Sequence, residues 1–279
     1  MNSANAQNES YLQFFHCSPR SNKAGVRGYL YLLEDGYTLV LEGHGAMCAP
    51  KARFLPIWGP YSDQIHHIII GEGITEIESR CFTGLKNLQT IQFPETLTAI
   101  YSEAFKDCTS LRELLLPESL EYIGPCAFYH CTDLQRVSFG SKIYGIESEA
   151  FSGCRRLEKI TLPTNLQKLG NHAFSHCISL VDITLSNSLK HIPSGAFFGC
   201  SQLKHILVPA SIQSIGDLAF ARCKGLVSLD LSQAIELKML YSSAFADCVG
   251  LRTVYIQDEQ RGFCLHHFHG PELSLVTQS

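Results

Sequence analysis

Apolar residues recur along most of the chain with a period of 23 residues. The most regular position is a phenylalanine, usually preceded by alanine, and six successive steps between phenylalanines are 23 residues long and the last is 25. These residues are Phe82, Phe105, Phe128, Phe151, Phe174, Phe197, Phe220 and Phe245. A leucine follows each of them six residues later, without exception. A fixed period of this length predicts a protein built from structural repeats.

Each repeat predicts a short β-strand and a second short apolar segment. The positions nine and eleven residues after the phenylalanine are apolar, as in Ile160 and Leu162, and residues two apart in a strand share one face. A proline, glycine or serine usually follows and predicts a turn. A second apolar segment, such as Leu166 with Leu169, comes before the next phenylalanine. A single repeat cannot enclose a core, so the repeats must stack as a solenoid.

Cysteine occupies one fixed position of the repeat. Three residues after the phenylalanine, seven of the eight repeats carry cysteine and the first carries Leu85. The seven are Cys108, Cys131, Cys154, Cys177, Cys200, Cys223 and Cys248. Stacked repeats would hold these side chains parallel and about 4.8 Å apart, whereas a disulfide needs converging Cβ atoms about 3.8 Å apart. We therefore expect buried, reduced thiols rather than disulfides or metal ligands.

The repeat resembles the BspA-type leucine-rich repeat. One unit contains Leu111, Leu114, Leu116, Pro117, Leu120, Ile123, Ala127, Phe128 and Cys131. The resemblance covers about residues 65–257 and extends upstream to a Gly-x-Gly-Ala-Met segment ending at Met47 and to Trp58. It implies a parallel β leucine-rich-repeat solenoid that is curved, with short turns or 3-10 segments and an N-terminal β cap.

The resemblance also predicts how the chain is divided. We expect a polar N-terminal segment at 1–28, an N-terminal β cap at 29–60, repeats at 61–257, and a C-terminal cap or tail at 258–279. A cap is expected because the open end of a solenoid would expose apolar core and unpaired backbone groups.

Composition excludes some partners and leaves two compartments open. The chain has 22 Lys and Arg against 26 Asp and Glu, which argues against nucleic-acid binding. It contains no apolar run long enough to span a membrane, and its first residues do not resemble a signal peptide. Members of the resembled family are often secreted or displayed at the cell surface, whereas many unpaired cysteines are typical of the cytoplasm.

The sequence contains no motif that predicts catalysis. It lacks the H-E-x-x-H, C-x-x-C, G-x-G-x-x-G and G-x-S-x-G patterns, so we expect neither an enzyme nor a cofactor. Cys264, His266, His267 and His269 form a cluster of soft metal ligands near the C-terminus. They are weak metal candidates, because one short segment cannot surround a zinc ion with four ligands, and a strand that covers the last repeat is the favoured interpretation.

Function is therefore expected on the exposed face of the repeat sheet. Positions eight and ten after the phenylalanine should face solvent, since they alternate with the buried positions. Among them are Leu115, Arg136, Lys159, Leu207 and Tyr255, which are residue types that interfaces use. We predict a non-catalytic, adhesion-like interaction module that binds a protein or other macromolecule through these residues. The alternatives are a structural spacer without its own ligand, or a metal-binding protein that uses the C-terminal cluster.

Overall fold

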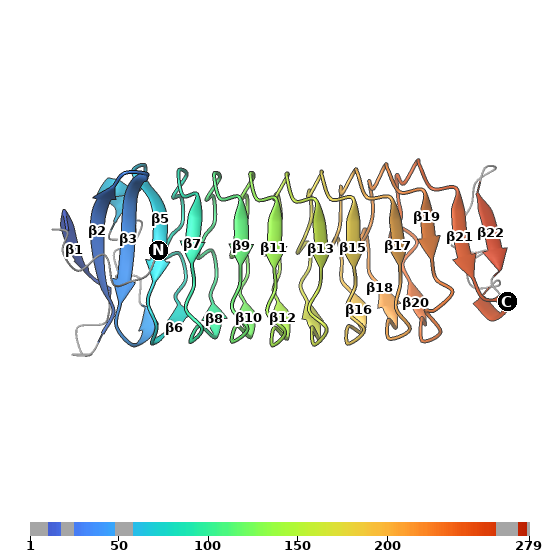
Figure 1. The fold of residues 1–279 in the computed structure, drawn as a ribbon. Helices are drawn as coiled ribbons and strands as arrows, with labels where there is room; N and C mark the ends of the chain where they lie inside the picture. The colour runs from blue at the N-terminus through green and yellow to red at the C-terminus, as the bar shows by residue number, and fades with distance from the viewer. Residues whose placement is uncertain (1–10, 18–24, 48–57, 261–272, 278–279) are drawn as a thin grey trace.

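Each repeat folds into one turn, or rung, of a parallel β-solenoid. The computed structural model describes residues 11–17, 25–47, 58–260 and 273–277 of the 279-residue chain. In these ranges the rungs follow one another in a single row from the N-terminal strands to β22 (Figure 1). The described residues contain strands, turns and two 3-10 segments, η2 (Gly59–Tyr61) and η3 (Asp258–Gln260). The repeat solenoid predicted from the sequence is confirmed.

One strand from each rung forms the front sheet. Its strands are β5 (Ile65–Ile70), β7 (Thr90–Gln92), β9 (Glu113–Leu115), β11 (Arg136–Ser138), β13 (Lys159–Thr161), β15 (Asp182–Thr184), β17 (His205–Leu207), β19 (Ser228–Asp230), β21 (Thr253–Ile256) and β22 (Ser274–Thr277). All pair in parallel, in hydrogen-bonded groups β5–β7, β9–β11, β13–β15 and β17–β19–β21–β22. The middle residue of β9, β13, β15 and β17 is buried and its two neighbours are exposed.

The second apolar segment of each rung forms the side sheet. Its strands are β4 (Gly45–Met47), β6 (Ile74–Ile77), β8 (Ala99–Ile100), β10 (Tyr122–Ile123), β12 (Gly145–Ile146), β14 (Lys168–Leu169), β16 (His191–Ile192), β18 (Ser214–Ile215) and β20 (Met239–Leu240). They too pair in parallel, in the groups β4 to β14 and β16 to β20. Figure 1 shows these strands along the lower edge of the array.

The N-terminal end is closed by an antiparallel cap. Strands β1 (Gln13–His16), β2 (Arg27–Leu33) and β3 (Gly36–Glu42) pair antiparallel, and β3 then pairs in parallel with β5. Phe15 and Cys17 are buried against the first rungs. Residues 13–16 and 27–28, within the expected polar N-terminal segment at 1–28, contribute β1 and the start of β2 to the cap.

A continuous stack of aromatic rings forms the centre of the solenoid. Trp58 stacks on Phe82 with ring centroids 5.0 Å apart, and stacking continues through all eight repeat phenylalanines at 4.9 to 5.7 Å. Seven of these phenylalanines are fully buried, whereas Phe245 at the C-terminal end is only partly buried. The stack ties each rung to its two neighbours through apolar contact.

The cysteine column lies beside this stack and is bonded to it. Each Sγ donates a hydrogen bond to the carbonyl oxygen of the phenylalanine one rung earlier, as from Cys154 to Phe128, at 3.1 to 3.4 Å along the column. The described cysteines are free thiols, and the column is buried except for the half-buried Cys248. Burial in apolar surroundings raises the pKa of Cys108, Cys154, Cys177 and Cys200, and that of Cys200 reaches about 12.

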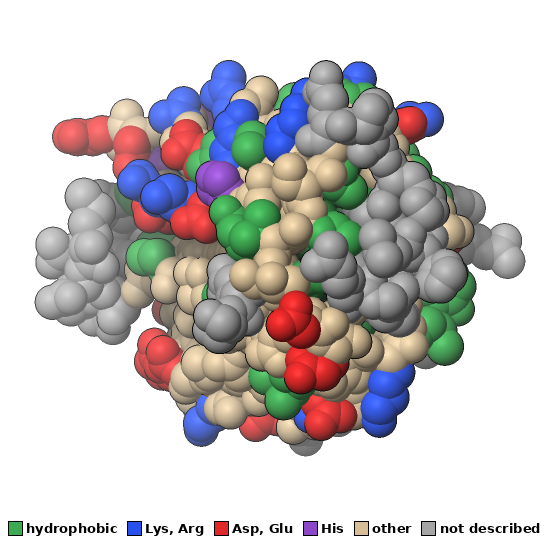
Figure 2. Space-filling view, turned by 90° about the vertical axis from the view of Figure 1, so that its right-hand side faces the viewer, with side chains coloured by type: hydrophobic (Ala, Val, Ile, Leu, Met, Phe, Trp, Pro, Cys, Tyr) green, Lys and Arg blue, Asp and Glu red, His purple; other side chains and the backbone are tan. Residues whose placement is uncertain are grey.

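Charged side chains of both signs lie around the outline of the array. Figure 2 shows Lys, Arg, Asp and Glu side chains in separate small groups when the molecule is viewed from its C-terminal side. Among the described residues, no helix has the length and apolar character that a membrane crossing requires.

Candidate partner-binding surface on the front sheet

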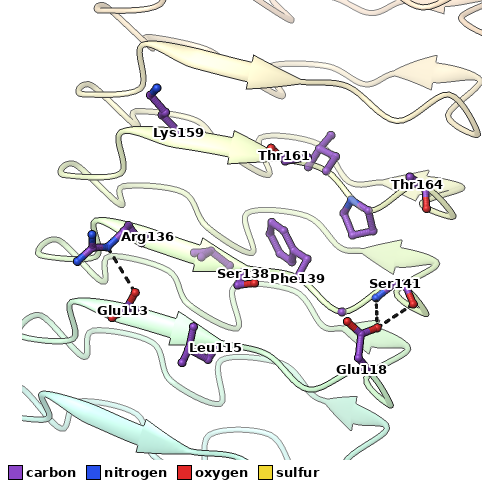
Figure 3. A pocket seen from close by; sticks show the side chains of 14 residues that line it. Glu113, Leu115, Glu118, Arg136, Ser138, Phe139, Ser141, Lys159, Thr161 and Thr164 are labelled. Carbon is purple, nitrogen blue, oxygen red and sulfur yellow. Dashed lines mark hydrogen bonds and ion pairs between the residues drawn. The ribbon is translucent and has the colours of Figure 1, made fainter.

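A shallow hollow of about 580 Å³ lies on the exposed face of the front sheet. It extends over β9, β11 and β13 and over the turns that follow them (Figure 3). We call it the front hollow. It lies where the hydrogen-bonded ladder changes, since β9 pairs with β11 and β13 pairs with β15.

The floor of the front hollow is apolar. Val137 and Phe139 occupy positions that the repeat pattern predicts to be core, yet both are only partly buried. One edge of Phe139 packs against the ring of Phe151, with centroids 5.7 Å apart and the planes perpendicular. Figure 3 shows the Phe139 ring among the side chains that line the hollow. Both side chains point inward and pack against the core, as the alternation predicts, but part of each stays exposed to the hollow.

A glycine shapes the end of the hollow. The turn after the strand carries Pro117 and Pro163 in the neighbouring rungs and Gly140 between them. A Cβ atom on residue 140 would lie 2.3 Å from the carbonyl oxygen of Pro117, which is closer than any side chain tolerates. Gly140 thus permits the close approach of two rungs where the hollow ends.

The rim of the hollow carries charges of both signs. Arg136 Nε lies 3.4 Å from the Glu113 carboxylate, and both side chains are exposed, so the pair contributes little to stability. Lys159 is exposed and forms no ion pair with any described residue. Glu118 accepts hydrogen bonds from the backbone N–H and the hydroxyl of Ser141, and these bonds lower the pKa of its carboxyl group. One rim cation thus remains free to meet an anionic group.

The structure separates the five predicted contact residues into two groups. Leu115, Arg136 and Lys159 line the front hollow, and the Leu115 side chain is 64% exposed. Leu207, which is 47% exposed, lies on β17, and the half-buried Tyr255 lies on β21, both outside the hollow.

The alternation of the strand residues did not identify every residue of the hollow. The pattern places Phe139 inward, and it treats a glycine at position 140 as one of the residues expected in the turn. The only sequence signal for the hollow is the glycine that replaces a turn proline between two repeats that keep it.

The proposed metal ligands cannot be placed against this surface. Cys264, His266, His267 and His269 lie outside the described residues. Within the described ranges, no three His, Cys, Asp or Glu side chains come together in a way that could hold a metal ion.

Comparisons with solved structures find the same fold in bacterial leucine-rich repeat proteins. A leucine-rich repeat protein from Bacteroides ovatus is 20% identical, with 90% of this chain and 77% of that chain covered and a TM-score of 0.57. The leucine-rich repeat protein of T. pallidum is 21% identical, with coverages of 88% and 95% and a TM-score of 0.51. At these identities the likeness concerns the fold alone. No curated protein matches the chain.

A family model gives a stronger result. The model of the BspA type leucine-rich repeat region, which describes six copies of the repeat, matches residues 61–177 and 144–273. Together the two matches span most of the chain and include every repeat from Phe82 to Phe245. The chain therefore belongs to the BspA-type leucine-rich repeat family.

Proposed function

We propose that this protein is a non-catalytic interaction module that binds a partner protein through its front sheet. The observation that carries the proposal is the front hollow, which combines an apolar floor with a charged rim. Interfaces concentrate aromatic and aliphatic contacts at their centre and surround them with polar groups. The family resemblance suggests an adhesion-like role at a cell surface as the setting for such a module.

The solenoid provides a rigid base for this contact. The strands of the hollow lie directly over buried residues such as Leu114 and Ile160, which pack into the same core as the aromatic stack. A partner would meet a surface that is already ordered, so little conformational entropy would be lost from this side on binding.

The predicted contact residues have different roles in the proposal. Leu115 and Phe139 would contact an apolar side chain of the partner, and Lys159 would pair with a carboxylate beside it. Leu207 and Tyr255 would form a second contact region further along the front sheet, which suits a partner that extends over several rungs.

Site-specific photocrosslinking tests which surface meets the partner. The photoreactive residue p-benzoylphenylalanine is placed at Leu115, and in a second protein at Ile178, which is also exposed but lies in the turn before β15, outside the front hollow. We expect a discrete adduct from position 115 in extracts or on cells that contain the partner. Equal crosslinking from position 178, or none from position 115, would contradict the proposal.

A matched pair of triple variants tests the chemistry of the contact. Leu115→Ser, Arg136→Ala and Lys159→Ala remove one aliphatic, one arginine and one lysine side chain from the hollow. Ile178→Ser, Arg155→Ala and Lys224→Ala remove the same types from exposed turn positions. Binding of the crosslinked partner should fall at least tenfold in the first protein, or about 1.4 kcal/mol, and stay unchanged in the second. If both retain full binding, the chain is better described as a spacer.

A further inference from the structure

The exposed face of the side sheet is acidic toward its N-terminal end. Three carboxylates lie on this face: Glu76 is on β6, Glu78 directly follows β6, and Glu121 directly precedes β10. None of them forms an ion pair with a described residue. The nearby Glu76 and Glu78 charges contribute to raising the pKa of the Tyr101 hydroxyl, after burial as the largest cause, which places these carboxylates close to the tyrosine. We call these three residues the acidic half.

The same face is basic further along the array. Lys168 lies on β14, Lys190 directly precedes β16, and His191 lies on it, and all three side chains are exposed. Lys168 pairs with Glu147, whereas Lys190 forms no ion pair within the described part of the chain. We call Lys168, Lys190 and His191 the basic half.

Three tyrosines run along this face from the acidic half toward the basic half. The rings of Tyr101 and Tyr122 have centroids 6.1 Å apart, and those of Tyr122 and Tyr144 are 6.5 Å apart. Tyr122 is paired in register with Ala99 on one side and Gly145 on the other, so the residues beside it are small. Tyr144 is 47% exposed. Tyrosine is enriched at protein interfaces.

We propose that this face binds the same face of a second copy of the chain, with the order of the rungs inverted. Inversion about a two-fold axis near β10 and β12 places the acidic half of each copy on the basic half of the other. The arrangement without inversion would oppose acid to acid and base to base. A two-fold contact uses the same surface on both copies and closes at two subunits.

Charge complementarity also predicts how the dimer behaves. The face from β6 to β16 contains six strands, so it is about 24 Å long at the usual strand spacing of about 4.8 Å, and it is narrow. A small, charged interface gives a weak and salt-sensitive association. The dimer should therefore form at high protein concentration and low ionic strength, and dissociate as salt screens the two pairs of halves.

Charge-reversal variants of the full chain test the proposal by sedimentation equilibrium. Wild-type protein should be dimeric in about 10 mM salt and monomeric in about 1 M salt, where the screening length falls from roughly 30 to 3 Å. The double variant Glu78→Lys, Glu121→Lys makes both halves basic, and Lys168→Glu, Lys190→Glu makes both acidic. Each should be monomeric alone. An equimolar mixture of the two should dimerise, which also shows that both variants are folded.

A third variant controls for net charge. Lys204→Glu with Lys224→Glu changes the net charge from −4 to −8, as Lys168→Glu with Lys190→Glu does, but at exposed positions outside the side sheet. This control should dimerise like the wild type. A wild type that stays monomeric in low salt at its solubility limit would overturn the proposal, as would species larger than a dimer or a mixture that stays monomeric. The triple variant of the front hollow should still dimerise, so failure of one proposal does not decide the other.

Discussion

At the scale of single residues, several histidine rings lie close to the Cα atom of a glycine in the next rung. A Cβ atom added to Gly153 would lie 2.4 Å from the His130 ring, and one added to Gly195 would lie 2.2 Å from the His172 ring. Both glycines have positive φ, which side chains rarely adopt. Glycine is therefore required twice at these positions, by the backbone conformation and by the neighbouring ring.

Gly153→Ala should lower the free energy of unfolding by about 2 kcal/mol, because it combines left-handed backbone strain with the contact to His130. Gly84→Ala is the matched control, since Gly84 has φ +77 and open space around the added Cβ. Gly84→Ala should lower the free energy of unfolding only by the strain of the left-handed backbone, about 1 kcal/mol. Urea unfolding of both variants measures the difference, and adding His130→Ala to Gly153→Ala should remove it. If Gly153→Ala and Gly84→Ala lowered the free energy of unfolding equally, the contact with the His130 ring would be refuted.

At the scale of elements, the repeat pattern predicted the strands and the core because each rung presents the same apolar columns. Phenylalanine, leucine and cysteine columns could be read from the sequence, since stacking forces equivalent residues into equivalent places. The front hollow could not be predicted in this way. The repeat gives β11 and β13 the same pattern of apolar and polar residues, yet Val137 and Phe139 are only partly buried whereas Ile160 and Leu162 are buried.

Because of the aromatic stack, a Phe→Ala substitution in a central rung should lower the free energy of unfolding more than the same substitution in the last rung. Phe151→Ala should destabilise the protein by about 3 to 5 kcal/mol, because its ring is fully buried and stacks on Phe128 and Phe174. Phe245→Ala should cost less, since that ring stacks on Phe220 at the end of the row and is only partly buried. Chemical denaturation of both variants compares them. A larger loss at Phe245 would mean that the stack is not what holds the rungs together.

At the scale of the whole molecule, stability depends on many rungs that are each held by the same contacts. The column of buried thiols should make the free energy of unfolding depend on pH, which can be measured. Burial raises the pKa of Cys200 to about 12 from an ordinary value of 9.0, and it raises the pKa of Cys108, Cys154 and Cys177 as well. These thiols stay protonated in the folded state while those of the unfolded chain ionise.

The sign of the resulting pH dependence follows from proton binding. Each thiol with a raised folded pKa contributes stability that is fully present below about pH 9 and is lost as the pH rises toward its folded value, since the unfolded chain then binds fewer protons. The slope should approach about 1.4 kcal/mol per pH unit for each such thiol.

Cys200→Ala should therefore reduce the slope of unfolding free energy between pH 10 and pH 11 by about this amount. Cys126→Ala, at a half-buried cysteine outside the column, should reduce it less. Urea unfolding across this range measures both, and equal slopes in the wild type and Cys200→Ala would show that the column does not retain its protons in the fold.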